Sequence, residues 1–298
     1  MSAIQRISQV FQQAHQIPFD DDSRFVLFSD CHRGDNSWAD DFASNQSLLF
    51  HALEHYYAEG FSYIEVGDGD ELWENSKFGD IRQAHSHIFW VMRKFHENQR
   101  LFLIYGNHDI ERSDPKVVDE TLQYYYDERT GQVQPLFVNI QVYEGIILNH
   151  VVNERQLFIL HGHQADPFND RYWKIGRFTA RHFWRHLQLL GVKEPTSPAK
   201  NFKKRVQIEN TLNDWVKLSG QMLIAGHTHR PRIPAPGQPL YFNCGSCIHP
   251  RGITGLEIVN SQISLIKWWM TSGSGGAVYI KRQELAGPIS IESYYVQG

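Results

Sequence analysis

Five short apolar runs in this chain each end on residues that can bind a metal ion, and this repetition constrains the fold more than any other feature. The runs are residues 25–28 before Asp30 and His32, 63–66 before Asp68, 101–104 before Asn107 and His108, 157–160 before His161 and His163, and 222–225 before His227 and His229. In an open α/β sheet, the loops at the carboxyl ends of the strands meet at one crevice. We therefore expect an α/β fold in which these five segments converge on one site.

The ligands available at such a site are oxygen and imidazole nitrogen. They come from seven residues: Asp30, His32, Asp68, Asn107, His161, His227 and His229. These donors suit Mn²⁺, Fe or Zn²⁺ and do not suit Cu(I) or an iron–sulfur cluster, which prefer sulfur ligands. Seven ligands exceed the need of one tetrahedral zinc ion, whereas two metal ions that share a bridging carboxylate would use them all. The sequence thus predicts a dinuclear centre.

The residues of these five blocks resemble the calcineurin-like metallophosphoesterases. The matching strings are Ser29-Asp30-Cys31-His32, Gly67-Asp68-Gly69-Asp70-Glu71, Gly106-Asn107-His108-Asp109, His161-Gly162-His163 and Gly226-His227-Thr228-His229, all within residues 24–268. The resemblance implies two packed mixed β-sheets flanked by helices and two bound divalent cations, with Mn²⁺ the expected metal and Fe or Zn²⁺ the alternatives. It also implies that Asp30, His32, Asp68 and His229 hold one cation and that Asp68, Asn107, His161 and His227 hold the other, with Asp68 as the bridge.

Within this superfamily the chain looks most like the branch that contains the UDP-2,3-diacylglucosamine pyrophosphatases, because a long helical segment precedes Gly226-His227-Thr228-His229-Arg230-Pro231. Those pyrophosphatases typically have arginine where this chain has His108 and aspartate where it has His163. The implied reaction is hydrolysis of a phosphate ester or pyrophosphate by metal-bound hydroxide. The expected substrate is a phosphorylated small molecule, a nucleotide or a lipid-linked compound.

Three residues beside the ligands are candidates for chemistry or for substrate contact. His108 follows a ligand directly yet is not needed as one, so its imidazole is free to stabilise charge or to protonate the leaving oxygen, oriented by Glu71 or Asp109. Arg33 and His163 are expected to contact the substrate, although each could equally be a satisfied polar group.

Residues 165–220 interrupt the strand pattern with two helical stretches, and we expect them to form an insertion. On the first stretch, an apolar side would be lined by Tyr172, Ile175, Thr179, Phe183 and Leu190. A basic stripe on the same helix would consist of Lys174, Arg177, Arg181 and Arg185. One interpretation is a solvated face over a packed one. The other, implied by the related pyrophosphatases, is a lid over the active site that binds an acyl chain.

Composition favours one domain in the cytoplasm. At 298 residues, with 41% hydrophobic content and a net charge of −4, the chain can bury one large core and has no global basic field that would attract nucleic acid. No apolar run reaches the ~18–20 residues of a membrane span, and residues 1–20 lack the compact apolar core of a signal peptide. We expect a single domain over residues 1–298. A peripheral membrane contact through the amphipathic N-terminal helix is an alternative.

Two other functions are compatible with the motifs. A non-catalytic metal-binding scaffold of the same fold should have lost ligands, but none of the seven is replaced here. A phosphoprotein phosphatase would share the metal chemistry but would need an open groove, which the long insertion disfavours. The cysteines Cys31, Cys244 and Cys247 are odd in number and sparse, so no disulfide scaffold is expected. We expect Cys31 to pack in the core, and a redox role for the other two is weakly supported.

The remaining pattern predicts the order of elements. Helices are expected near residues 4–14, 42–59 and 81–98, and the last two alternate with strands as βαβαβ, which predicts a parallel half-sheet. From residue 135 onwards, apolar runs at 135–140, 141–149, 156–160, 222–225, 240–243, 256–259 and 263–268 are closely spaced and predict hairpins.

Overall fold

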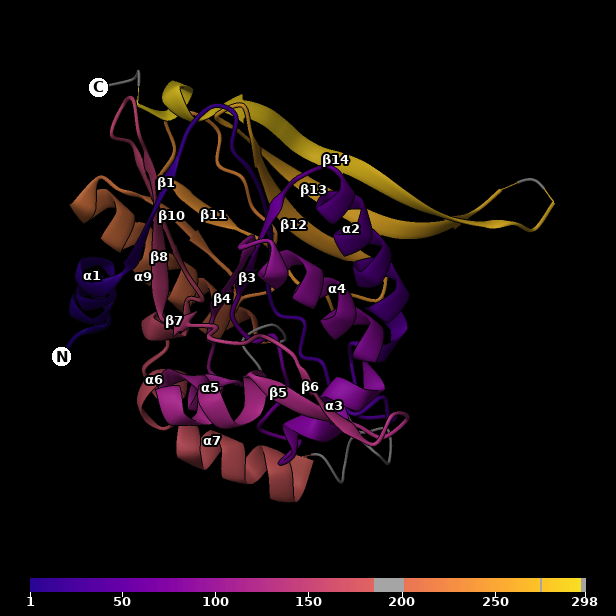
Figure 1. Cartoon of the computed structure of the whole chain (residues 1–298). Coiled ribbons are helices and arrows are strands. Elements are labelled where there is room, and N and C mark those ends of the chain that lie inside the picture. The colour runs from indigo at the N-terminus through magenta and orange to yellow at the C-terminus, as the bar shows by residue number, and fades with distance from the viewer. Residues whose placement is uncertain (185–200, 274, 296–298) are drawn as a thin grey trace.

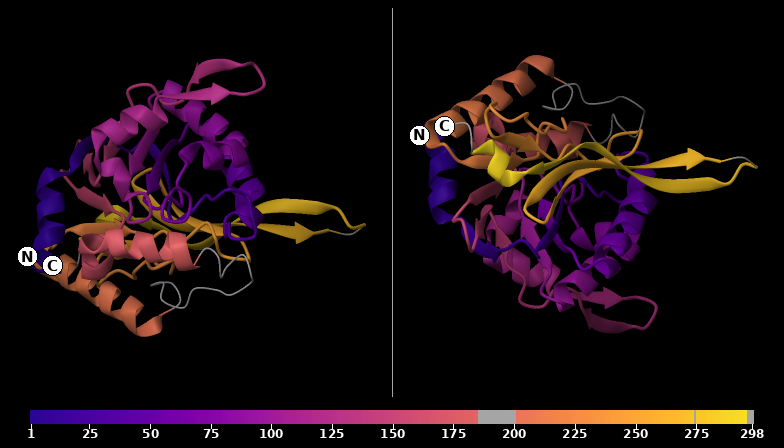
Figure 2. Two further views of the ribbon diagram at one scale, coloured as in Figure 1. Left: turned by 90° about the horizontal axis from the view of Figure 1, so that it is seen from below. Right: turned by 90° about the horizontal axis from the view of Figure 1, so that it is seen from above.

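Two β-sheets pack face to face in the body of the protein, and helices cover the outer face of each (Figures 1 and 2). The computed structural model describes residues 1–184, 201–273 and 275–295. Within these residues, one sheet has seven strands and the other has five, and each contains both parallel and antiparallel pairs. The expected α/β architecture of two mixed sheets flanked by helices is thus confirmed.

The seven-stranded sheet has the strand order β14-β13-β12-β2-β3-β4-β7. Its strands are β2 (Arg24–Phe28), β3 (Ser62–Val66), β4 (Leu101–Ile104), β7 (Val142–Tyr143), β12 (Ile253–Val259), β13 (Gln262–Ser272) and β14 (Val278–Ser290). Strands β2, β3 and β4 run parallel, as the βαβαβ pattern predicts, and β7 joins them in the same direction, whereas β12, β13 and β14 are antiparallel. Because parallel strands end at the same edge, the loops after β2, β3 and β4 lie together.

The five-stranded sheet has the order β1-β8-β9-β10-β11. Its strands are β1 (His15–Phe19), β8 (Gly145–His150), β9 (Gln156–Leu160), β10 (Met222–Ala225) and β11 (Tyr241–Asn243). The pair β8 and β9 is an antiparallel hairpin, as predicted, while β9, β10 and β11 run parallel. Every residue of β10 is buried, because both faces of this sheet are covered. Because β9 and β10 run parallel, the ligand-bearing loops that follow them lie at the same edge of the sheet.

The core lies between the two sheets and under the helices. Apolar side chains from both sheets, such as Leu27, Ile64 and Ile159, form the central cluster. Helices α2 (Gln46–Ala58) and α4 (Ser86–Glu97) cover the seven-stranded sheet, and α1 (Ala3–Gln13) and α9 (Phe202–Ser219) cover the five-stranded sheet. The amphipathic helix α1 buries Ile7 and Val10 against the body, so its apolar face is occupied.

Shorter elements gather at the lower end of the molecule in Figure 1, where α5, α6 and α7 lie. They are α3 (Phe78–Ala84), α5 (Pro115–Leu122), α6 (Pro167–Arg171), α7 (Trp173–Thr179), the π-helical turn η4 (Ala180–Trp184) and the ribbon of β5 (Tyr124–Asp127) and β6 (Gln132–Pro135). Single 3₁₀ turns are η1 (Ala43–Asn45), η2 (Ile110–Ser113), η3 (His163–Ala165) and η5 (Ile291–Tyr294). The predicted insertion contains α6, α7, η4 and α9, and its residues 185–200, with Arg185 and Leu190, lie outside the described residues. None of the helices in the described part of the chain is long and apolar enough to cross a membrane.

Several local features differ from the predictions. The helix expected at residues 81–98 is two helices, α3 and α4, which break at His85, where the ring Nε2 lies 2.8 Å from Asp40 Oδ2. Residues 136–140 form no strand, because Phe137 and Ile140 are apolar for packing in the core and not for a pleated surface. Strand β14 was not predicted, since most of its side chains are exposed and show no apolar alternation. With β13 it forms a ribbon that extends well beyond the body (Figure 1).

Candidate metal centre

All seven predicted ligands lie in the loops that follow β2, β3, β4, β9 and β10. Within the described residues, two groups made up of predicted ligands keep their ligand atoms within 4.8 Å of one another: Asp30, His32 and His229, and Asp68, His161 and His227. His32 also forms such a group with Glu71 and His108, which lie beside the ligands. Asn107 is also buried, and the backbone N–H of its neighbour His108 donates a 2.8 Å hydrogen bond to Asp68 Oδ1. The structure therefore brings the predicted ligands together at one edge of the two sheets, beside α5, α6 and α7.

Asp68 lies between the two groups. Its Oδ2 is 3.1 Å from His161 Nε2 and 3.7 Å from His32 Nε2. Asp30 occupies the matching position in the first group, with its Oδ1 3.0 Å from His229 Nε2. One carboxylate oxygen of Asp68 thus faces an imidazole from each group, which is the arrangement expected for a carboxylate shared by two cations.

Five of the ligand atoms are buried without a hydrogen-bond partner among the described residues. They are Asp30 Oδ1, His32 Nε2, Asn107 Oδ1, His161 Nε2 and His227 Nε2. Two of them lie close to other ligand atoms of the set, Asp30 Oδ1 at 3.0 Å from His229 Nε2 and His161 Nε2 at 3.1 Å from Asp68 Oδ2. Buried polar atoms are nearly always hydrogen-bonded, and leaving one unpaired costs about 1–3 kcal/mol. Because oxygen and imidazole nitrogen are good donors to Mn²⁺, Fe and Zn²⁺, these residues fit the two expected divalent cations.

Five ligands have a left-handed backbone, which is uncommon for residues other than glycine. The φ angles are 54° at Asp30, 47° at His32, 50° at Asp68, 65° at His227 and 53° at His229. Such residues cost roughly 1–3 kcal/mol each and cluster at functional sites, where the surrounding structure enforces them. The preceding glycines allow this crowding: a Cβ on Gly226 would lie 1.9 Å from Ser29 Oγ, and a Cβ on Gly106 would lie 2.1 Å from Asp68 Oδ1. The glycines of the motifs are therefore required by close packing.

Hydrogen bonds orient the ligand histidines. The Nδ1 of His161 lies 2.9 Å from the carbonyl oxygen of Val66, and the Nδ1 of His32 lies 2.9 Å from Glu71 Oε2. Both partners accept hydrogen bonds, so each Nδ1 is the donor and carries the proton. The Nε2 atoms therefore point into the site, where each can bind a cation once it has lost its proton, which is the usual arrangement of a metal-binding histidine.

His108 shares the carboxylate of Glu71 with His32. Its Nδ1 lies 2.7 Å from Glu71 Oε2, and 22% of its side chain is exposed. Of the two residues expected to orient His108, Glu71 makes this contact. Asp109 instead accepts hydrogen bonds from the backbone N–H groups of Gly69 at 2.9 Å and Gly106 at 2.6 Å. His108 is thus the partly exposed imidazole at the rim of the buried ligand set.

Opposite charges in and around the ligand set outweigh the effect of burial on the acidic groups. Burial by itself raises the pKa of Asp30, but His229 and His161 bring the pKa well below its ordinary value. In the same way, His108 and His32 lower the pKa of Glu71 to about 2 despite its burial. Burial lowers the pKa of His161, yet Asp68 and Asp30 raise it to about 9. The carboxylates are therefore charged at neutral pH and favour positive charge at the centre.

Arg33 has the contacts expected of a satisfied polar group, the alternative to a substrate contact. Its side chain is buried beneath the ligand loops, where Nη1 and Nη2 donate to the two carboxylate oxygens of Glu65 at 2.6 and 2.8 Å. Its Nε donates to Asp70 Oδ1 at 2.7 Å. This pairing holds the guanidinium on two buried carboxylates. The sequence did not indicate this role, because Glu65 lies inside the apolar run of β3.

His163 is also buried, and its expected contact with substrate stays a prediction. Neither ring nitrogen has a hydrogen-bond partner among the described residues, and burial, followed by the nearby charge of His161, holds the pKa of His163 well below its ordinary value. Glu144 and Asp170 are close enough to form a further candidate cation cluster with it. However, the guanidinium of Arg6 pairs with both acids, at 3.4 Å from Asp170 Oδ1. A cation is thus already present in this cluster.

Asp166 is a neighbour of the metal centre that sequence reasoning missed. Its Oδ2 lies 3.5 Å from His227 Nε2 and 2.8 Å from Lys204 Nζ. It also caps α6, where it accepts hydrogen bonds from two backbone N–H groups and precedes Pro167. Burial raises the pKa of Asp166, but His227 and Lys204 lower it to about 2. The Asp-Pro pair at a helix start was the available signal, and it ties the insertion to the ligand His227.

The three cysteines belong to the hydrophobic cores. Cys31 and Cys247 are buried in the cluster under α2 and α4, which confirms that Cys31 packs inward between two ligands. Cys244 is buried in the separate cluster between the sheets. Because Cys244 and Cys247 point into different clusters, they do not form the redox pair that their spacing could suggest.

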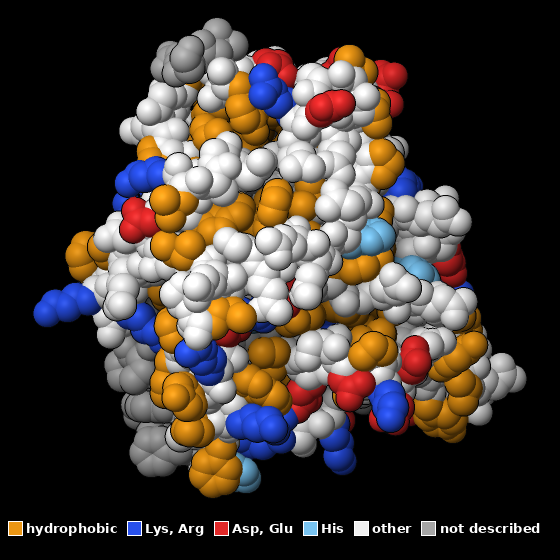
Figure 3. Space-filling model, turned by 90° about the vertical axis from the view of Figure 1, so that its left-hand side faces the viewer, with side chains coloured by type: hydrophobic (Ala, Val, Ile, Leu, Met, Phe, Trp, Pro, Cys, Tyr) orange, Lys and Arg blue, Asp and Glu red, His pale blue; other side chains and the backbone are white. Residues whose placement is uncertain are grey.

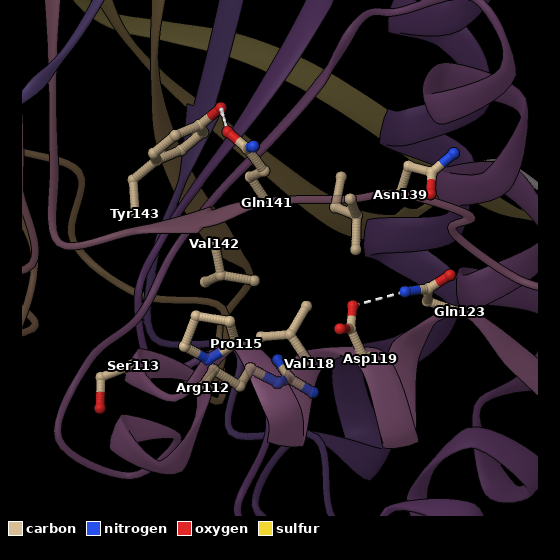
Figure 4. A pocket seen from close by; sticks show the side chains of 11 residues that line it. Arg112, Ser113, Pro115, Val118, Asp119, Gln123, Asn139, Gln141, Val142 and Tyr143 are labelled. Carbon is tan, nitrogen blue, oxygen red and sulfur yellow. Dashed lines mark hydrogen bonds between the residues drawn. The ribbon is translucent and has the colours of Figure 1, made fainter.

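A pocket of about 450 Å³ lies between α5 and β7 and contains none of the predicted ligands (Figure 4). Its lining residues are Arg112, Ser113, Pro115, Val118, Asp119, Gln123, Asn139, Ile140, Gln141, Val142 and Tyr143. Four of its polar side chains are hydrogen-bonded in two pairs: Gln123 donates to Asp119, and Tyr143 donates to Gln141 at 3.1 Å. The metal centre, with its unpaired buried atoms, is the better candidate for chemistry.

Comparison with protein families matches residues 23–231 to the calcineurin-like phosphoesterases. No curated protein matches the chain. Two solved structures that it resembles are a cold-active protein-tyrosine phosphatase of a psychrophile, Shewanella sp., and a point mutant of a cold-active protein tyrosine phosphatase. They are 12% and 13% identical, with TM-scores of 0.40 and 0.39, and each match covers 90% of this chain and 82% of the other. These scores are too low to assign a substrate.

Proposed function

The chain belongs to the calcineurin-like phosphoesterase family, and we propose that it hydrolyses a phosphate ester or pyrophosphate bond with two divalent cations held at the metal centre. The observation that carries the proposal is the position of Asp68 Oδ2, 3.1 Å from His161 Nε2 and 3.7 Å from His32 Nε2. Two cations, when bound, would activate a water molecule and neutralise the phosphoryl oxygens of the substrate. Mn²⁺ is the metal we expect, with Fe or Zn²⁺ as alternatives.

The ligands divide around Asp68 in this proposal. One cation would be held by Asp30, His32 and His229 together with Asp68, and the other by Asn107, His161 and His227 together with Asp68. The two groups of ligand atoms that lie within 4.8 Å of one another support this division. The backbone and side-chain contacts of Val66 and Glu71 support it as well, because they leave the Nε2 atoms of His161 and His32 directed inward.

His108 would act on the leaving group. It lies beside the ligands but donates to Glu71 through Nδ1, so its Nε2 is left to face the substrate from the partly exposed rim. An imidazole in this position can stabilise the charge on the leaving oxygen or give it a proton. The contact with Glu71 raises the pKa of His108 above its ordinary value despite burial, which favours the protonated form that this role requires.

The substrate we propose has an apolar part, as in the UDP-2,3-diacylglucosamine pyrophosphatase branch. Helices α6 and α7 expose large apolar side chains next to the centre: Phe168, Tyr172, Ile175 and Phe178 are each at least 50% exposed. Figure 3 shows hydrophobic side chains among Lys and Arg at the lower end of the molecule, where these helices lie. An apolar surface edged by cations suits a lipid tail joined to a phosphate, and it would also allow peripheral contact with an anionic membrane.

Metal analysis together with a substrate panel tests the reaction class. Purified protein should contain close to two metal ions per chain and should hydrolyse at least one phosphomonoester, phosphodiester or nucleotide pyrophosphate. Changing His108→Ala should leave metal content unchanged and lower kcat by roughly 10²–10⁴-fold for a substrate with a poor leaving group. A phosphoprotein as the only substrate would redirect the proposal to a protein phosphatase, and metal binding without any hydrolysis would redirect it to a scaffold.

A second experiment tests the apolar substrate. Each methylene group that α7 buries should contribute about 0.8 kcal/mol. Changing Ile175 and Phe178 together to Ala should therefore weaken turnover of a lipid-linked pyrophosphate by at least about 10-fold and leave a small chromogenic phosphodiester almost unaffected. Leu218→Ala, which removes an exposed apolar side chain from α9, is the matched control. Equal losses on both substrates would mean that α7 only supports the fold.

A further inference from the structure

The imidazole of His108 is held between two other rings. The indole of Trp73 stacks on one face, with ring centroids 4.3 Å apart and an interplanar angle of 21°. The ring of His32 meets it edge to face, with centroids 4.6 Å apart and an angle of 86°. The imidazole also donates the hydrogen bond from Nδ1 to Glu71. The hydrogen bond fixes Nδ1, while the stack on Trp73 and the edge contact with His32 restrict the tilt of the ring plane, so the stack helps to set the direction of Nε2.

Trp73 is itself held by the insertion. The side chain is only 7% exposed, and a Cβ built on Gly176 of α7 would lie 2.8 Å from the Trp73 ring, so helix and indole are in close contact. Arg181 donates hydrogen bonds to the carbonyl oxygens of Trp73 at 3.1 Å and Leu72 at 2.7 Å. The insertion is therefore joined to the segment that follows the bridging ligand.

We propose that Trp73 is a positioning residue for His108 and that α7 keeps it in place. This inference rests on the proposed role of His108 toward the leaving group. Trp73 Nε1 is buried and has no hydrogen-bond partner among the described residues, so the indole contributes through its ring face and not through its N–H. A residue that keeps an aromatic face should preserve the function, whereas an aliphatic residue of similar size should not.

The consequence of losing the stack is a misaligned proton donor. Displacing a catalytic group by about 1 Å can reduce the rate by as much as about 100-fold. The loss should be large only where the leaving group needs help, because a good leaving group departs without a proton. Metal binding should not change, because Trp73 stacks on His108, which is outside the ligand set.

The test measures kcat of the metal-loaded protein on two aryl phosphate esters, phenyl and 4-nitrophenyl, which have a poor and a good leaving group. Trp73→Leu should lower kcat about 10- to 100-fold on the poor leaving group and no more than about 3-fold on the good one, at unchanged metal content. Trp73→Phe should restore most of the rate. Gly176→Ala, whose added methyl group pushes on the indole, should reproduce the loss in weaker form with every side chain of the site intact. Trp90→Leu on the outer side of α4, where the indole is 54% exposed, is the matched control.

A double-mutant cycle separates this inference from the function on which it rests. In the His108→Ala background, Trp73→Leu should cause no further loss, because there is no imidazole left to position. If His108→Ala alone has no effect on either ester, the proposed role of His108 fails. Two outcomes would overturn the inference while His108→Ala behaves as expected. In the first, Trp73→Leu and Gly176→Ala slow both esters equally. In the second, Trp73→Leu adds its full effect to that of His108→Ala, and in either case Trp73 only supports the fold. Should Trp73→Leu fail to fold, the Gly176→Ala variant decides between these outcomes.

Discussion

Changing Arg33→Met should destabilise the protein and leave substrate binding unchanged. The guanidinium is fully buried and donates three hydrogen bonds to Glu65 and Asp70, at 2.6 to 2.8 Å. Asp70 also pairs with Arg112, so Glu65 is the carboxylate that would lose its cation. Removing one partner of a buried ion pair costs about 3–5 kcal/mol, because the other charge stays buried and unpaired.

This energy converts into a measurable shift of the melting temperature. Unfolding entropy is about 2.1 cal/mol/K per residue near 60 °C, which is roughly 0.6 kcal/mol/K for 298 residues. The expected decrease in Tm is therefore about 5–8 °C by calorimetry. Arg93→Met is the control: Arg93 pairs with Glu97 at 2.7 Å on an exposed helix surface, where such a pair contributes at most about 0.5 kcal/mol, or under about 1 °C.

The kinetic measurement decides between the two roles of Arg33. If the residue only supports the ligand loops, the folded fraction of Arg33→Met should bind substrate with a KM close to that of the wild type. If instead the Tm stays within about 1 °C of the wild type while KM rises severalfold, the substrate contact expected from sequence is right and the argument from burial is wrong.

Three further predictions concern the metal centre. Asp68→Ala should abolish activity and bring metal content well below two per chain by elemental analysis; retention of both would exclude a bridging role. Removing metal with a chelator should lower Tm by about 4 °C when the free metal had been at 100 times its Kd, because such binding contributes about 2.7 kcal/mol. Adding Mn²⁺ should restore the original Tm. An unchanged Tm would show that these ligands bind no ion that stabilises the fold. Although burial opposes it, Asp68 raises the pKa of His161 to about 9, so metal binding near pH 7.5 should displace a proton that is absent near pH 10. Calorimetry in buffers of different ionisation enthalpy measures this release, and equal heats in all buffers at the lower pH would contradict it.

The ligand set could be predicted because each of its blocks is local in sequence. A buried strand followed at once by glycine and an acid, amide or imidazole is visible without any knowledge of the fold, as in β3 followed by Gly67 and Asp68. The parallel order of β2, β3 and β4 then brings the blocks to one edge. The alternation of strands and helices predicted that order too, so the two inferences supported each other.

The residues around the ligands could not be predicted, because their roles depend on tertiary contacts. Arg33 looked like a substrate contact until Glu65 was found beneath it, on the neighbouring strand. Trp73 lies outside the five motif blocks, and only the fold places it on His108. The break between α3 and α4 likewise depends on a contact of His85 with a distant acid, Asp40, and no local propensity signals it.

Without bound metal, the ligand loops hold unfavourable backbone conformations and unpaired buried atoms, and the surrounding fold explains why these persist. Five buried ligand atoms have no hydrogen-bond partner among the described residues, and without metal such atoms destabilise the loops that carry them. Left-handed backbone at Asp30 and Asp68 adds to this destabilisation. The strands behind the loops, β2, β3 and β10, are almost completely buried between two covered faces and hold the loops in position. Bound cations would satisfy the unpaired atoms, so the centre should be the part of the protein whose stability depends most on metal, while the sheets behind it should remain folded without metal.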